Sequence, residues 1–277
     1  MTTTAATAVT AGTLGVPGAR LHYEVRGSGP LVVLVGAPMG ADAFAPLAGL
    51  LAEDHTVLTT DPRGVGRSPV DDPEQDSTPE LRADDLSRLI GHLGAGPAVA
   101  LGSSGGAVTV LALAQSHPEQ VITVVAHEPP LSELVDDRDR LRAGTERIMA
   151  TYLAEGSAAA WREFMAVGDI VVPEDDAHTA PPPEAERDAQ AVADERHFFL
   201  HELRGTTRWQ PDLAVLRAVP TRVVVGIGEA SAGELCDRTS RALAARLGLE
   251  PTMFPGSHVG FLEDPAAFAT RFRDVVG

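Results

Sequence analysis

The feature that most constrains the fold of this chain is a regular alternation of short apolar runs with longer helix-like stretches. The apolar runs are Leu31–Val35, Thr56–Thr60, Ala98–Leu101, Val121–Ala126, Thr221–Val225 and Thr252–Phe254, and the half-polar run Arg20–Val25 precedes them. The helix candidates between them are Ala43–Ala52, Pro79–Leu93, Gly106–Ser116 and Glu234–Leu247, with a last helix opening at Asp264-Pro265. Strands that alternate with helices in this way are typical of βαβ units, in which helices cover both faces of a parallel sheet. We therefore expect an α/β fold with a mostly parallel central sheet flanked by helices.

The alternation breaks between residues 131 and 212. This stretch is helix-like and acidic, contains the Pro181–Pro183 run, and holds five large aromatic residues: Trp161, Phe164, Phe198, Phe199 and Trp209. Because it stands between two core strands, it reads as a helical lid inserted over one end of the sheet. An ordinary set of packing helices is the alternative. The predicted organisation is a core in two parts, residues 1–130 and 213–277, with the lid over residues 131–212.

Composition excludes several kinds of chemistry. All 22 basic residues are Arg, so no lysine is present for a Schiff base or for a Walker A phosphate loop. The single cysteine, Cys236, excludes an internal disulfide and a zinc site built on cysteine clusters. The net charge of −17 argues against a nucleic-acid partner. The apolar runs are too short to span a membrane, and the first ten residues lack the pattern of a secretory signal, so we expect a cytoplasmic protein.

The strongest chemical signal is Gly102-Ser103-Ser104-Gly105-Gly106, which has the pattern G-x-S-x-G. It follows an apolar strand and precedes a helical run, which is the context that a nucleophile elbow requires. A nucleophile on so tight a turn needs small neighbours, since chain segments pass close to it. Ser104 is therefore the predicted nucleophile, and a glycine-rich turn without chemistry is the alternative.

A serine hydroxyl needs a base to accept its proton. Of the nine histidines, His258 is the best placed, because it follows the short last strand and a Gly-Ser turn and should lie over the carboxyl edge of the sheet. His22, His55, His92 and His117 read as surface residues, and His178 lies in the Pro-rich part of the lid. His197 and His201 could share a helix face and bind a metal, but no third ligand is evident, and an amphipathic lid helix is favoured.

The base needs a carboxylate partner, and two candidates follow strands. Glu128 follows Val121–Ala126, and Glu229 follows Thr221–Val225, the commoner location for the acid. If the register there slips by two residues, Ser231 takes the position of Glu229. The backbone N–H groups of Ala37 and Gly105 are the predicted oxyanion donors, because Pro38 has no N–H. Gly226-x-Gly228 is too incomplete for a nucleotide fingerprint.

These segments resemble the α/β-hydrolase superfamily over nearly the whole chain. The run Asp61–Ser68 looks like its D-x-R-G-x-G-x-S turn, which is mostly structural, whereas Val35-Gly36 stands where many members carry His-Gly. A closer similarity, to the lactone-hydrolysing group that includes the zearalenone lactonases, lies in the elbow, in His127-Glu128-Pro129 and in Pro255–His258. The resemblance implies a triad of Ser104, Glu128 and His258, and it moves the preferred acid from Glu229 to Glu128. The lid does not match that group, so its particular substrate is not implied.

The sequence thus predicts a serine esterase or lactonase that acts on a hydrophobic small molecule and needs no cofactor or metal. Carbon–carbon bond hydrolysis or cofactor-free perhydrolysis on the same triad is one alternative, since a fold does not fix a reaction. A non-catalytic ligand-binding protein is another. We expect no nucleic-acid or membrane partner, and a homodimer is left open beside a monomer.

Overall fold

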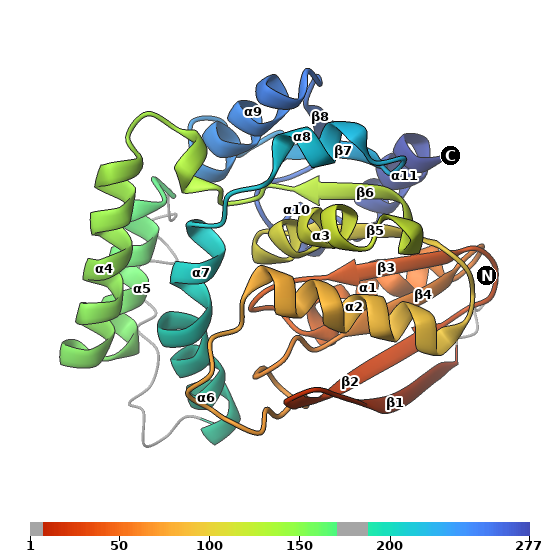
Figure 1. The fold of residues 1–277 in the computed structure, drawn as a ribbon, viewed down its shortest axis with the longest axis horizontal. Helices are drawn as coiled ribbons and strands as arrows, with labels where there is room; N and C mark the ends of the chain where they lie inside the picture. The colour runs from red at the N-terminus through yellow and green to blue at the C-terminus, as the bar shows by residue number, and fades with distance from the viewer. Residues whose placement is uncertain (1–7, 171–187) are drawn as a thin grey trace.

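The computed structural model describes residues 8–170 and 188–277, so Pro181–Pro183 and His178 lie outside the described residues. A central sheet of eight strands lies between helices on its two faces (Figure 1). The strand order is β1-β2-β4-β3-β5-β6-β7-β8; β1 and β2 pair antiparallel, β2 and β4 pair antiparallel, and every later pair is parallel. The strands are β1 Val9–Val16, β2 Ala19–Arg26, β3 Leu31–Val35, β4 Thr56–Thr60, β5 Ala98–Ser103, β6 Val121–His127, β7 Arg222–Gly228 and β8 Thr252–Phe254. This arrangement confirms the predicted fold class.

Two of the helices that cover the sheet, α2 and α11, begin where their capping residues predict. Thr78 accepts a hydrogen bond from the Leu81 N–H at the start of α2, and Asp264 accepts one from the Ala267 N–H at the start of α11. In each helix a proline occupies the first turn, where its missing N–H has no partner to lose. The α-helices of the described residues are α1 Ala41–Leu51, α2 Pro79–Leu93, α3 Gly105–Ser116, α4 Arg138–Glu155, α5 Ser157–Val167, α6 Ala189–His197, α7 Leu203–Thr207, α8 Leu213–Ala218, α9 Leu235–Leu247, α10 Gly260–Glu263 and α11 Pro265–Val276.

Strand β3 shows why the continuous apolar run was a reliable signal. All five of its residues are buried. Leu31, Val33 and Val35 point into one hydrophobic cluster, with α2 and α3, while Val32 and Leu34 point into the other, with α1 and α11. Because both faces of this strand are covered by helices, every position has to be apolar.

The strand β1 was not predicted. Most of its side chains are exposed, and it lies at the edge of the sheet, where it pairs with β2. Its sequence, VTAGTLGV, carries two glycines and little apolar alternation, so the local pattern was weak. Pairing with its neighbour stabilises the strand, which single-strand periodicity cannot show.

The stretch between β6 and β7 contains α4 to α8 and a five-residue π-helix, Phe198–Glu202. Its aromatic residues divide into two groups. Trp161 stacks on Phe198 with ring centroids 5.3 Å apart and meets Phe199 edge-on at 4.9 Å. Trp209 instead packs into the main core, and its indole N–H donates to Glu80. The lid boundaries, residues 131 and 212, remain a prediction.

Among the described residues, none of the helices combines the length and the apolar character that crossing a membrane requires.

Candidate active site

Ser104 lies between β5 and α3 in a strained backbone conformation. Its φ is 56° and its ψ is −122°, outside the regions that residues with a side chain prefer. Only glycine fits at the two flanking positions, for a steric reason. A Cβ on Gly102 would lie 2.1 Å from the Gly106 carbonyl oxygen, and a Cβ on Gly106 would lie 2.1 Å from the Val35 carbonyl oxygen. The tight turn that the motif predicts is therefore present, with Ser104 half-buried at its tip.

The two predicted oxyanion donors lie against each other. A Cβ on Gly105 would stand 2.7 Å from the carbonyl oxygen of Ala37 and 2.9 Å from its Cβ, so the β3–α1 loop passes directly over the start of α3. Within the described residues, no hydrogen-bond acceptor is found for the N–H of either residue. Both groups are thus available to a negatively charged oxygen, and the N-terminus of α3 adds a favourable dipole.

The Asp61–Ser68 turn supports this loop. One carboxylate oxygen of Asp61 accepts the Ala41 N–H at 2.8 Å, at the point where α1 begins. The other accepts the backbone N–H and the guanidinium Nε of Arg67, and Ser68 donates to the Asp61 carbonyl. Burial opposes ionisation of Asp61, but these bonds from Arg67 and Ala41 lower the pKa of its carboxyl. The turn has the structural role that the resemblance implies.

Glu128 is the second strained residue. It directly follows β6, its φ is 55°, and its side chain is fully buried. One carboxylate oxygen accepts the Gly228 N–H at 2.8 Å, and the other lies 2.5 Å from Nδ1 of His258. The Ser104 N–H donates to the carbonyl of His127, the residue before Glu128, at 3.0 Å. The elbow is therefore hydrogen-bonded to the residue before Glu128 at the carboxyl ends of the neighbouring strands β5 and β6, and Glu128 in turn holds the imidazole of His258.

Glu128 and His258 each favour the charged form of the other. Burial opposes ionisation of Glu128, but the hydrogen bond and charge of His258, together with His127, lower the pKa of its carboxyl below the ordinary value. Burial would also lower the pKa of His258, yet the neighbouring Cys236 and Glu128 raise the pKa of that imidazole well above its usual 6.5. A carboxylate that stays ionised beside an imidazole stabilises the imidazolium when it forms.

Glu229, the alternative acid, is not part of this group. It is exposed, and its backbone N–H is bonded to the Phe254 carbonyl. Ser231, two residues later, is fully buried, and its hydroxyl lies beside Glu128 and helps to lower the pKa of that carboxyl. The glycines of Gly226-x-Gly228 serve close packing, because a Cβ on Gly228 would lie 2.5 Å from the Ser257 carbonyl oxygen.

Sequence reasoning missed two residues at this site. His127 is fully buried between Phe254 and Phe268, which meet its ring edge-on, and burial lowers the pKa of its imidazole to about 4. It therefore stays neutral and acts as part of the core. Cys236, half-buried in the first turn of α9, lies beside His258. Its position depends on the angle of α9 against the sheet, for which the sequence carries no local signal.

The candidate lid histidines are part of local contacts. Nδ1 of His201 lies 3.2 Å from a carboxylate oxygen of Asp76. His197 is buried, and the centre of its ring lies 5.8 Å from the centre of the His201 ring. Burial lowers the pKa of His197 to about 4. His197 thus ends α6 and His201 lies in the following π-helix, and both are held by their immediate neighbours.

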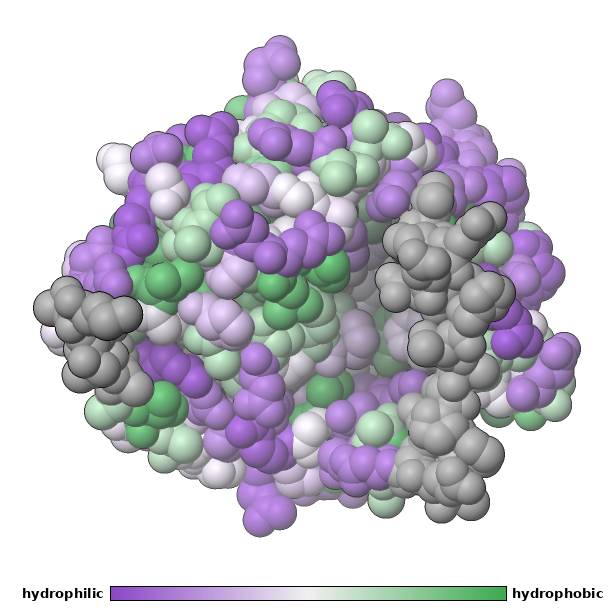
Figure 2. All heavy atoms as spheres, turned by 180° about the vertical axis from the view of Figure 1, so that it is seen from behind, coloured by the Kyte–Doolittle hydropathy of each residue, from purple (hydrophilic) through white to green (hydrophobic). Residues whose placement is uncertain are grey.

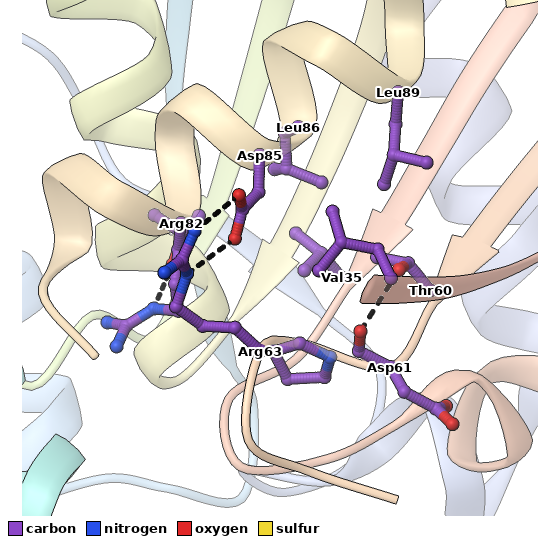
Figure 3. A pocket seen from close by; sticks show the side chains of 11 residues that line it. Val35, Thr60, Asp61, Arg63, Arg82, Asp85, Leu86 and Leu89 are labelled. Carbon is purple, nitrogen blue, oxygen red and sulfur yellow. Dashed lines mark hydrogen bonds and ion pairs between the residues drawn. The ribbon is translucent and has the colours of Figure 1, made fainter. Parts of the chain in front are cut away.

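Two hollows differ in size and setting. A small cavity of about 10 Å³ is lined by residues of α2, by Val35 of β3 and by Arg63. Its volume is at the lower limit for one water molecule (Figure 3). A cleft of about 420 Å³ lies beside Pro38 on the oxyanion loop and reaches Asp194 on α6. Only the second has the size of a small-molecule site. Figure 2 shows a recess on the face opposite to Figure 1, with hydrophobic residues along its margin.

Comparisons with known proteins agree with this fold. The model of the alpha/beta hydrolase family matches residues 31–271. An uncharacterized hydrolase of Bacillus subtilis, YraK, is 33% identical over 270 residues, which cover 96% of this chain and 95% of that protein. A zearalenone hydrolase of Bionectria ochroleuca is 25% identical over 283 residues, covering 94% and 95%. A thermophilic esterase from Thermogutta terrifontis shares the fold, with a TM-score of 0.70 at 21% identity over 96% of this chain and 98% of that one. The chain belongs to the α/β-hydrolase family and is a hydrolase of that type.

Proposed function

We propose that the protein is a serine hydrolase that cleaves a carboxylic ester or lactone of a hydrophobic small molecule through an acyl-enzyme on Ser104. The observation that carries this proposal is the contact between Glu128 and Nδ1 of His258, directly beside the strained elbow. A carboxylate-bound imidazole, together with a half-buried serine on a tight turn, is the set of groups that acyl transfer needs.

In the proposed reaction, the Ser104 hydroxyl attacks the substrate carbonyl carbon while Nε2 of His258 takes its proton. The oxyanion that forms accepts hydrogen bonds from the N–H groups of Ala37 and Gly105, each worth about 3–4 kcal/mol in the transition state. Collapse of the intermediate breaks the bond to the leaving alkoxide, which takes the proton from His258. A water molecule then repeats the sequence on the acyl-enzyme, releases the acid and restores Ser104.

Three observations support a small ester or lactone as the substrate. The relative from Bionectria ochroleuca is named as a zearalenone hydrolase, and the segments around Ser104, Glu128 and His258 resemble the lactone-hydrolysing group. The cleft beside Pro38 has the volume of a small-molecule site. The helices between β6 and β7 carry an aromatic cluster around Trp161, which suits an apolar substrate.

The test combines covalent labelling with a substrate series. A fluorophosphonate probe should label the wild-type chain on Ser104, identified by peptide mass spectrometry, and should leave Ser104→Ala unlabelled. Aryl esters and lactones of graded acyl size should be hydrolysed by the wild type, with kcat lowered by about 10⁴-fold or more in Ser104→Ala. Labelling without turnover of any ester or lactone would instead favour another reaction on the same serine. If the chain is not labelled and hydrolyses no substrate, the non-catalytic ligand-binding protein is the remaining alternative.

A further inference from the structure

A thiol lies beside the acid and base of the candidate triad. The Cys236 sulfur, a ring nitrogen of His258 and a carboxylate oxygen of Glu128 all lie within 4.8 Å of one another. Glu128 is fully buried, and Cys236 and His258 are half-buried. The acyl-transfer steps described above use Glu128 and His258 and give Cys236 no part. The cluster therefore holds one donor atom that the proposed reaction does not explain.

The three donor types are those that zinc prefers. Thiolate, imidazole and carboxylate bind this ion at about 2.0–2.3 Å, which places the ligand atoms of one tetrahedral site about 3.3–3.7 Å apart. Because the present atoms lie within 4.8 Å of one another, side-chain movements of at most about 1–1.5 Å would close the longer separations into that range. Such a movement has to lengthen the contact of 2.5 Å between Glu128 and His258, so the ion competes with the pair.

The surrounding charge also favours a cation. Glu234, at the start of α9, stands two residues before Cys236, and its carboxyl group lies within electrostatic range of Glu128. Two neighbouring carboxyl groups and a thiol give the site a negative potential that a divalent cation would neutralise.

We propose that Glu128, Cys236 and His258 form an inhibitory binding site for a thiophilic divalent cation such as Zn²⁺. On binding, the Cys236 thiol releases its proton to solvent, and a nitrogen lone pair of His258 and an oxygen of Glu128 complete three of four positions, with water as the fourth. Coordination at Nε2 removes the base, and coordination at Nδ1 removes its carboxylate partner. Either mode stops proton transfer from Ser104. The inhibition rests on the proposed function, whereas the binding does not.

Binding is tested without reference to activity. Cd²⁺ added to the EDTA-treated, full-length protein should produce the ultraviolet charge-transfer band of a cadmium thiolate. Cys236 is the only cysteine of the chain, so the band can arise only there. Cys236→Ser should abolish the band, and His258→Gln should raise the Cd²⁺ concentration for half-saturation at least about tenfold. His201→Gln, at a second histidine with carboxylate neighbours, is the matched control and should bind as the wild type does. The absence of a band in the wild type would overturn the proposal.

Inhibition is tested on the best ester from the substrate series, with each variant referred to its own metal-free rate. Zn²⁺ should inhibit the wild type and His201→Gln equally, EDTA should restore both, and Mg²⁺ should have no effect. Cys236→Ser should need at least about tenfold more Zn²⁺ for half-inhibition. Equal inhibition of Cys236→Ser would place the inhibiting ion elsewhere and overturn the proposal. A cadmium band in a protein that hydrolyses no substrate would refute the proposed function alone, and hydrolysis without a band would refute this inference alone.

Discussion

Oε2 of Glu128 lies 2.5 Å from Nδ1 of His258, although 130 positions separate the two residues in the chain. The other oxygen of Glu128 is held by the Gly228 N–H, so both ends of the carboxylate have a defined partner. This double attachment orients the imidazole with its second nitrogen away from Glu128. The geometry thus suits the proposed roles of an acid that positions a base, with the candidate acid at the end of β6 and not of β7.

The acid assignment predicts a large difference between two matched variants. Glu128→Gln keeps an oxygen for the Gly228 N–H but loses the charge opposite His258, so we expect kcat on an activated ester to fall by about 10⁴-fold. Glu229→Gln alters an exposed side chain and should leave kcat nearly unchanged. Circular dichroism and the melting temperature of both variants control for folding. A larger loss in Glu229→Gln would refute the assignment of Glu128.

The raised pKa of His258 predicts the pH dependence of the reaction. A base must be neutral, so activity rises with pH as the imidazolium loses its proton. Burial lowers the pKa of this imidazole, but Cys236 and Glu128 outweigh burial and raise it well above 6.5. The acid limb of a kcat/KM profile, measured in EDTA, should therefore have its midpoint above pH 6.5. A midpoint at or below that value would contradict the raised pKa.

The elbow glycines predict a contrast between two Gly→Ala substitutions. A Cβ on Gly106 would lie 2.1 Å from a backbone oxygen of Val35, so Gly106→Ala must displace β3 or α3. We expect this variant to lose most of its activity and to unfold at a lower denaturant concentration than the wild type. At Gly91, within α2, no atom lies within 4 Å of an added Cβ, so Gly91→Ala should raise the free energy of unfolding by about 0.5–1 kcal/mol. Wild-type activity and stability in Gly106→Ala would contradict the steric reading.

The chain order of motifs indicated most of the candidate site. Ser104 and His258 follow strand signals that local periodicity shows well, and Gly105 comes with the elbow. The acid was harder, because Glu128 and Glu229 both follow strands. The resemblance favoured Glu128, and the structure places that carboxylate, not that of Glu229, against His258. No local pattern predicted that Cys236 lies beside His258, because this contact depends on how α9 packs against the sheet.

The fold was predictable where burial dictates the sequence. Strand β3 and helix α2 have the predicted bounds, because β3 is covered on both faces and α2 has Thr78 as its cap. Strands β5 and β6 run on to Ser103 and His127, beyond their apolar residues, since pairing between the two strands continues there. Such pairing is a tertiary effect that residue type alone does not reveal.

A buried ion pair between Arg63 and Asp85 of α2 predicts a loss of stability when one partner is removed. Arg63 donates two hydrogen bonds of 2.7 Å to the two carboxylate oxygens of Asp85, and both side chains are less than a tenth exposed (Figure 3). Burial raises the pKa of the Asp85 carboxyl even though Arg63 opposes the shift. Removing one partner leaves the other without compensation, so Arg63→Met should lower the free energy of unfolding by about 3–5 kcal/mol. Without Arg63 to oppose burial, the pKa of the Asp85 carboxyl in the folded variant should rise further, so the variant loses more stability than the wild type as that carboxyl ionises. The difference between the two proteins should therefore grow from pH 5 to pH 8.

Two controls separate this effect from a general loss of charge. Arg140→Ala removes a half-exposed pair with Asp137 and should change the free energy of unfolding by at most about 1 kcal/mol. Arg63→Met combined with Asp85→Leu removes both charges, so it should recover much of the stability lost in the single variant. Urea unfolding followed by tryptophan fluorescence measures all three, because Trp209 lies in the same core as α2. If the double variant is as unstable as Arg63→Met, the loss comes from packing of the side chains, and an unpaired buried charge is not its cause.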